Sequence, residues 1–112
     1  MKGLKDDGLD GTKPVKLRWD LVPMECLDDL VSVLTYGASH YKAKSWMELE
    51  DAENRYFAAL MRHLSASRQG EMNDSESGLS HLSHAMCNVI FLLWFEKHKN
   101  NEETTQDKDR SC

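Results

Sequence analysis

The sequence predicts a small all-α protein, an antiparallel bundle of helices, and three observations lead to this fold class. Three segments place apolar residues at the spacing of one helix face. The last two of these segments are joined by a short polar turn, which requires their helices to lie side by side. At 112 residues, the chain is expected to form one domain with a single modest core.

The first predicted helix follows an N-terminal region of different character. Residues 1–16 combine Gly, Pro and charged residues without apolar periodicity, so we expect a flexible arm. Residues 17–23 (LRWDLVP) form a short extended segment that ends in a Pro suited to the first turn of a helix. We therefore expect a helix over 23–36, which Gly37 ends. Its apolar stripe is Met24, Leu27, Leu30, Val31 and Leu34, with Cys26 beside it.

Three acids on this first helix allow two interpretations. Glu25, Asp28 and Asp29 share one helix face, and such a spacing suits metal ligands. Acids near a helix N-terminus are also favoured by the helix dipole when they only face solvent. We favour the solvated face, and the metal-ligand interpretation stays open.

The connection over 37–52 carries aromatic and basic side chains. Tyr41, Lys42, Lys44 and Trp46 follow one another closely, and lysines beside aromatics suit a phosphate group and a base. An ordinary solvated loop has similar residues, so both interpretations remain at this point.

The second helix is predicted over 51–69, with Asp51 as its cap and Gly70 as its end. Its core stripe is Phe57, Leu60, Met61 and Leu64. The third helix is predicted over 78–99, with Ser75 or Ser77 as its cap.

The third helix also predicts an assembly. Residues 89–95 (VIFLLWF) are apolar on every side of the helix, which favours a subunit interface. We therefore expect a homo-oligomer, a dimer or a tetramer, that completes the small core. Residues 100–112 are charged and lack an apolar stripe, so we expect a disordered tail and a folded domain over 17–99.

Charge and cysteine content restrict the partners. The formal charge of −5 disfavours nucleic acid, whose phosphates attract basic proteins. The cysteines Cys26, Cys87 and Cys112 are scattered, and the first two lie in apolar helical patterns that predict buried thiols in a reducing cytoplasm. The apolar run over 89–95 is too short to cross a membrane. We expect a cytoplasmic protein with neither nucleic-acid nor membrane partners.

The segment 62–88 (RHLSASRQGEMNDSESGLSHLSHAMCN) concentrates polar side chains. His81, His84 and Asn88 fall at i, i+3 and i+7, so they share one helix stripe. Antiparallel packing brings the upstream helix and the acidic turn to the same place. The side chains that converge in this way are Arg62, His63, Glu71, Asp74, Glu76, His81, His84 and Asn88.

These groups suit metal and phosphate chemistry. Imidazole nitrogens and carboxylate oxygens bind divalent metals, and a guanidinium such as that of Arg62 binds phosphate oxygens. Together they can position water against a phosphoanhydride. Histidines near acids also occur where they only hydrogen-bond their neighbours. A helical interaction module with structural histidines is the corresponding alternative.

A longer pattern resembles a known family. The matching pieces, in chain order, are RWDLVP (18–23), VLTYGASHY (33–41), Trp46, AALMRHL (58–64), GE (70–71), DSESGLSHLSHAMCN (74–88) and FLL (91–93). Together they resemble the phage-encoded dATP/dGTP diphosphohydrolase N-terminal domain, a family similar to the all-α MazG-like nucleoside triphosphate pyrophosphohydrolases.

The resemblance implies a MazG-like helical oligomer that hydrolyses dATP or dGTP to the monophosphate and pyrophosphate with Mg²⁺ or Mn²⁺. A phage enzyme of this kind would act in the host cytoplasm. The metal ligands that we expect from it are Glu71, Asp74, His81 and His84. The expected catalytic groups are His63, Glu71 and His84. The expected substrate-binding residues are Arg18, Asp20, Tyr41, Lys42, Trp46, Arg62 and Asn88.

Two features of the sequence depart from the patterns of this family and of the MazG enzymes. His40 stands where the family usually has Lys before the tyrosine that matches Tyr41, so a phosphate-facing charge becomes pH-dependent or is missing. The carboxylate signature of standard MazG enzymes, EExxE followed by ExxD, is absent, and Asn88 lies near the place of the expected aspartate. An amide cannot supply that anionic ligand. The alternative function is therefore a non-catalytic protein that binds or sequesters nucleotides on the same fold.

Overall fold

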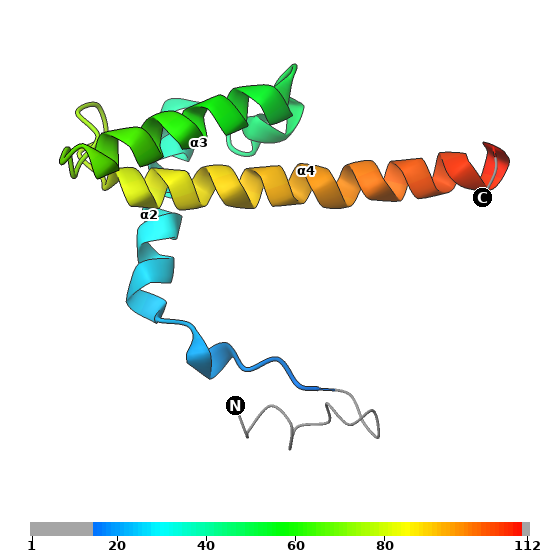
Figure 1. Ribbon diagram of the computed structural model, residues 1–112, viewed down its shortest axis with the longest axis horizontal. Coiled ribbons are helices and arrows are strands. Elements are labelled where there is room, and N and C mark those ends of the chain that lie inside the picture. Colours follow the sequence, from blue (N-terminus) through cyan, green and yellow to red (C-terminus); the bar gives the residue numbers. More distant parts are fainter. Residues whose placement is uncertain (1–14, 111–112) are drawn as a thin grey trace.

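The computed structural model describes residues 15–110, of which residues 100–110 are described by their backbone alone, and within this range the fold is all-α (Figure 1). The α-helices are α2 (Met24–His40), α3 (Ala52–Arg68) and α4 (His81–Arg110), and the short 3-10 helices are η2 (Trp19–Leu21) and η3 (Ser45–Glu48). Extended pairing in the described chain is limited to one isolated bridge between Asn73 and Ser80. The predicted all-α class is confirmed. Most of the expected N-terminal arm lies outside the described residues.

The long helix α4 is the element on which the others pack. Helix α3 lies antiparallel along its first half, and α2 crosses it near its start (Figure 1). The short helix η3 contacts both α3 and α4. No helix in the described part of the chain is both long and apolar enough to cross a membrane.

The core lies where α2 crosses α4. Leu30 and Val33 of α2 meet Cys87 and Phe91 of α4, and all four are buried. Trp46 of η3 stacks on the Phe91 ring, with 4.2 Å between ring centroids and 13° between ring planes. This aromatic stacking holds the connection over 41–51 against α4. The connection thereby becomes one wall of the candidate functional site.

Three predicted features of the first two helices are wrong. Helix α2 runs through Gly37 to His40, because a glycine costs a helix interior only about 1 kcal/mol and the Tyr41 N–H still donates to the Gly37 carbonyl. The expected core stripe of α3 is half exposed, with Phe57 at 55% and Met61 at 48%. Helix α3 packs on α4 alone among the α-helices, so its opposite face stays in solvent. Cys26 is likewise exposed, whereas Cys87 is buried as expected.

The turn between α3 and α4 is built by backbone hydrogen bonds. At the end of α3, the N–H groups of Gly70 and Glu71 donate to the carbonyls of Ser67 and Ala66. This Schellman arrangement needs a left-handed residue, and Gly70 supplies it with φ of 101°. The chain then folds back, and the His81 N–H donates to the Met72 carbonyl at 2.9 Å. The acidic residues of the turn are thereby placed beside the first turn of α4.

The start and the end of α4 differ from the prediction. The helix starts at His81, and Ser80 is its cap, since the Ser80 hydroxyl accepts the Leu82 N–H at 3.1 Å. Gly78 has a φ of 75° and lies outside the helix, so neither Ser75 nor Ser77 caps it. At the other end α4 continues to Arg110, where a disordered tail was expected. Residues 100–110 contain no Gly or Pro, and adding turns to an existing helix requires no new nucleation. The boundaries of the folded domain stay a prediction.

Candidate functional site

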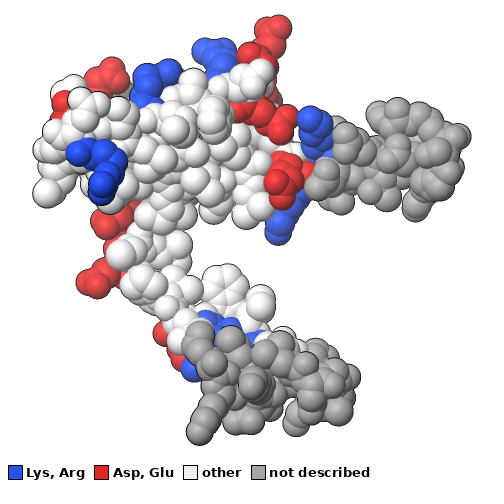
Figure 2. Space-filling model, in the orientation of Figure 1, with Lys and Arg blue, Asp and Glu red and all other residues white. Residues whose placement is uncertain are grey.

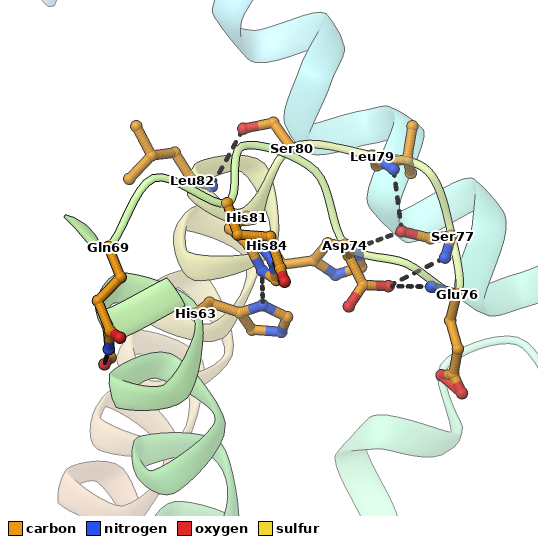
Figure 3. Close-up of polar contacts among 12 residues, drawn as sticks. His63, Gln69, Asp74, Glu76, Ser77, Leu79, Ser80, His81, Leu82 and His84 are labelled. Carbon is orange, nitrogen blue, oxygen red and sulfur yellow. Dashed lines mark hydrogen bonds and ion pairs between the residues drawn. The ribbon is translucent and has the colours of Figure 1, made fainter. Parts of the chain in front are cut away.

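Three histidines from two helices meet at the start of α4 (Figure 3). His63 comes from α3, and His81 and His84 come from α4. The Nδ1 atoms of His63 and His81 are 2.9 Å apart. The rings of His63 and His84 stack, with 4.7 Å between centroids and 11° between planes. Asp74 of the turn lies beside them (Figure 3). The predicted convergence of these four residues is present in the fold.

Glu71 fixes the orientation of His81. The Glu71 Oε2 atom lies 2.5 Å from His81 Nε2, and a carboxylate can only accept, so Nε2 carries the proton. In a neutral His81 ring, Nδ1 is then the acceptor, and His63 donates its Nδ1–H to it. The His81 side chain is 6% exposed and the Glu71 side chain 60%, so the pair joins a buried ring to the surface.

The electrostatic setting keeps the imidazoles of His63 and His84 neutral and the carboxylate of Asp74 ionised. Burial is the largest cause that lowers the pKa of His63, followed by the neighbouring His84 and His81. Burial also lowers the pKa of His84, against the opposing effect of Asp74. The Asp74 pKa is lowered chiefly by the hydrogen bond from the Ser77 N–H. At neutral pH the site therefore offers imidazole lone pairs next to a negative oxygen.

Ser77 positions His84, a role that sequence reasoning missed. The Ser77 hydroxyl oxygen lies 2.7 Å from His84 Nε2 and accepts the Leu79 N–H at 3.1 Å. Asp74 Oδ2 holds this turn by accepting the N–H groups of Glu76 and Ser77 at 3.1 and 2.9 Å. The sequence signal was the Asp-x-x-Ser spacing in the turn, which allows an Asx-type turn as well as a helix cap.

The residues that can hold a metal form a set different from the expected one. One ligand atom from each of His63, Asp74 and His81 lies within 4.8 Å of the others. Two imidazoles and a carboxylate are a donor set for a divalent first-row metal. An octahedral ion with donors at about 2.1 Å places neighbouring donors about 3.0 Å apart, and the two Nδ1 atoms are already at 2.9 Å. The residues therefore fit a metal, which would replace the hydrogen bond between the two Nδ1 atoms once the His63 proton has moved to Nε2. The other two expected ligands lie outside this group: Glu71 contacts the Nε2 atom of His81, and His84 is a neighbour of the group.

A cavity of about 770 Å³ opens next to the histidines, between α2, η3, α3 and α4. His84 and Asn88 of α4 line it, so His84 belongs both to the histidine cluster and to the cavity wall. The opposite wall comes from the segment over 41–47, which includes three predicted substrate residues. The lining residues used below are Tyr41, Lys42, Lys44, Trp46, Arg55, His84 and Asn88. Such a volume is typical of a small-molecule site.

Other predicted substrate residues lie elsewhere. Arg18 and Asp20 bind each other through two hydrogen bonds of 2.8 Å at the surface. The short helix η2, which begins directly after Arg18 and contains Asp20, packs on no other element of the described chain and lies far from the start of α4 in Figure 1. Arg62 is exposed and does not line the cavity, whereas Arg55, two turns earlier on α3, does. The heptad spacing places both arginines on one helix face, so the spacing alone could not separate them.

The acids of the first helix remain outside the site. Glu25, Asp28 and Asp29 are exposed on α2. The metal-fitting group in the described chain does not include them. This agrees with the solvated acidic face that we favoured.

Comparisons with known proteins identify a family and one relative of the chain. A family model described as dATP/dGTP diphosphohydrolase, N-terminal, matches residues 8–106. The chain is similar to a protein named dATP/dGTP diphosphohydrolase from Salmonella phage PMBT28, with 28% identity over 108 residues. That alignment covers 96% of this chain and 33% of the relative, so the chain spans about a third of the relative's length. No solved structure matches the chain.

Proposed function

This chain belongs to the dATP/dGTP diphosphohydrolase, N-terminal, family, and we propose from this membership that it hydrolyses dATP or dGTP. The products are the deoxynucleoside monophosphate and pyrophosphate. The cleaved bond is the anhydride between the α- and β-phosphates. The site for this reaction is the histidine cluster, and the nucleoside lies in the adjoining cavity.

The observation that carries the proposal is the continuity of the two sites. His84 stacks on His63 in the cluster and also lines the cavity. A ligand with a charged end and an apolar end, such as a nucleotide, fits a metal-binding group joined to an aromatic-walled cavity. Basic residues at the cavity then face the phosphates, and Tyr41 and Trp46 lie near the base or sugar. The basic residues are Lys42, Lys44 and Arg55.

Of Mg²⁺ and Mn²⁺, Mn²⁺ is the metal that this donor set favours. His63, Asp74 and His81 would hold it, and Glu71 keeps the proton on the far nitrogen of His81. Imidazole ligands suit first-row transition metals, whereas Mg²⁺ prefers oxygen donors and retains its water. Bound there, the metal supplies charge neutralisation for the phosphate oxygens. This proposal narrows the expected choice between Mg²⁺ and Mn²⁺ to Mn²⁺.

His84 is the proposed general base. Its lowered pKa keeps the ring neutral near pH 7, so it can take a proton from the attacking water. Ser77 occupies Nε2, and Nδ1 has no hydrogen-bond partner among the described residues. With the Nε2–H donated to the Ser77 hydroxyl oxygen, Nδ1 has the lone pair, so the proton from water goes to Nδ1. Ser77 holds the ring in place, and Lys42 and Arg55 orient the phosphates by charge.

Phosphorus NMR tests the reaction directly. Purified protein is incubated with dATP or dGTP, in Mn²⁺ or in Mg²⁺, and the resonances of products are recorded. We expect pyrophosphate and the monophosphate in Mn²⁺, and no product from the His81→Ala variant. The matched control is His98→Ala, an exposed histidine also on α4, whose ring bonds the Trp94 carbonyl at 2.9 Å and stacks on the Trp94 ring. Inorganic phosphate as the sole new product would refute the proposed bond cleavage.

A non-catalytic nucleotide binder is the second candidate, and one observation favours it. The metal-fitting group contains one carboxylate, Asp74, and its Oδ2 atom already accepts two backbone N–H groups. Few anionic oxygens remain for the metals of a hydrolytic site. This candidate predicts that dATP with Mn²⁺ raises the midpoint of thermal unfolding while the phosphorus resonances stay unchanged.

The homo-oligomer stays part of the proposal. Leu82, Val89, Ile90 and Leu93 of α4 are all exposed, and a broad uncharged area crosses the body of the molecule in Figure 2. Large exposed apolar patches mark interaction sites. Light scattering with size-exclusion chromatography measures the mass, and we expect a dimer or a tetramer, with Ile90→Lys shifting it toward the monomer. A monomeric wild-type protein would refute this part. The cytoplasmic location and the absence of nucleic-acid partners stay predictions.

A further inference from the structure

Asn88 is the one residue in the described chain with a fully buried side-chain oxygen or nitrogen that lacks a hydrogen-bond partner. The residue is 8% exposed and lies on the wall of the cavity, one helical turn beyond His84. The unpaired atom is the amide oxygen Oδ1. Buried polar atoms in native proteins are nearly always paired, so an unpaired acceptor at a cavity wall needs a donor from water or from a ligand in the cavity.

The neighbours of Asn88 on α4 do not need such a ligand. His81 is also buried, and both its ring nitrogens have partners in Glu71 and His63. Cys87 is buried in the core, and burial raises the pKa of its thiol to about 12, so it stays a neutral, weakly polar group. Within the described helix, the unmatched requirement for a hydrogen bond is therefore specific to Asn88.

We propose that the Asn88 amide oxygen binds a hydrogen-bond donor on the nucleoside of the substrate and thereby contributes to substrate selection. This inference rests on the proposed function, because it needs a nucleotide in the cavity. The terminal torsion of an Asn side chain is broad, so a small rotation brings Oδ1 to the cavity surface when a donor arrives. A site built to bond one polar group discriminates strongly against analogues that lack it.

The position of Asn88 along α4 limits the donor to the nucleoside. Asn88 lies seven residues from His81, about 10 Å along the helix axis at 1.5 Å per residue. The phosphates are held at the His81 end, so the sugar and the base extend toward Asn88. Phosphate oxygens at neutral pH are acceptors and cannot satisfy an amide oxygen. The donor is either the 3′-hydroxyl of the sugar or an amino or imino N–H of the base.

Equilibrium binding of matched analogues distinguishes these two sources. The ligands are dATP, purine deoxyriboside triphosphate without the 6-amino group, and dideoxy-ATP without the 3′-hydroxyl, each measured by calorimetry with Mn²⁺. All three carry an imido group between the α- and β-phosphates, because the protein is proposed to cleave the anhydride at that place. We expect Asn88→Ala to weaken dATP binding roughly tenfold, as for the loss of one buried hydrogen bond. For the analogue that lacks the relevant donor, the wild-type protein and the variant should bind equally, which identifies the donor.

Two controls keep the outcome decisive. Ser83→Ala, a buried polar residue of α4 that does not line the cavity, should bind all three ligands as the wild type does. The wild-type comparison of the three ligands needs no variant, so it stands even if Asn88→Ala folds poorly. An equal loss for all three ligands, or no loss at all, would overturn the role of Asn88 alone. A wild-type protein that binds no nucleotide would overturn the proposed function together with this inference.

Discussion

Replacing Asn88 by Leu should stabilise the ligand-free protein. The unpaired amide oxygen is buried without compensation in the described chain, and an unsatisfied buried acceptor costs about 1–3 kcal/mol. Leu removes this cost, and its higher helix propensity adds a few tenths of a kcal/mol. The adjoining cavity accommodates the larger side chain, so the overpacking cost stays small. We expect a gain of at least about 1 kcal/mol, or about 4–8 °C in the thermal midpoint for a domain of this size.

Urea and thermal unfolding followed by far-UV circular dichroism, without nucleotide or metal, measure this gain. Ser83→Ala is the control, because it changes another buried polar side chain of α4 whose oxygen is not among the fully buried, unpaired atoms. A midpoint for Asn88→Leu equal to or below that of the wild type would refute the reasoning. In that case the amide would already be satisfied in the free protein, and it would not await a ligand.

Three further predictions concern the core, the titrating groups and the positioning of the base. Phe91→Ala should lower the free energy of unfolding by about 3–5 kcal/mol in a urea titration, because the ring is buried and stacks on Trp46. Stability should fall as the pH drops from about 7 to about 5, since the folded pKa values of His63 and His84 lie below the ordinary value; a pH-independent wild type would contradict this. Ser77→Ala should lower kcat about tenfold with unchanged Mn²⁺ affinity, and Ser77→Thr should restore it; equal losses of kcat and metal affinity would instead indicate general disruption.

The sign of the pH prediction follows from proton binding. The unfolded chain binds a proton at each histidine near pH 6.5, whereas the folded chain resists it to a lower pH. Between the two pKa values the unfolded state holds more protons, so acid favours unfolding. The matched variant is His63→Gln with His84→Gln, which should flatten the profile in this range. Asp74 also has a lowered pKa, and its contribution is lost only at lower pH, around and below 3.8.

Helical spacing and chain reversal were enough to predict the histidine cluster. His81 and His84 share a stripe, and the short turn must return the chain along α3, so His63 and Asp74 arrive without further information. Helix existence was predictable for the same reason. The helix ends were harder to predict. Helix α2 continues through Gly37, and the cap of α4 is Ser80 although two other serines nearby are also suitable caps.

The cavity wall and the partner of each charged residue could not be predicted from spacing. Lys44 and Arg55 reach the cavity because Trp46 stacks on Phe91, which is a contact between distant segments. Arg18 and Asp20 have side chains that could bind a ligand, but they bind each other. Two residues of opposite charge that are two positions apart can meet locally. The role of Ser77 depends on the backbone bonds of the turn, which are set by Asp74 and the glycine conformations.

The burial pattern of α4 connects stability with function. In the described chain, the buried polar residues are His81, Ser83 and Asn88, and all three lie in the first eight residues of this one helix. A small domain has little hydrophobic stabilisation to offset such burial. For His81 the cost is offset by Glu71 and His63, and for Asn88 nothing in the described chain offsets it. Selection for stability alone would favour an apolar side chain at position 88, so the amide is best explained by a bound state in which its oxygen is paired.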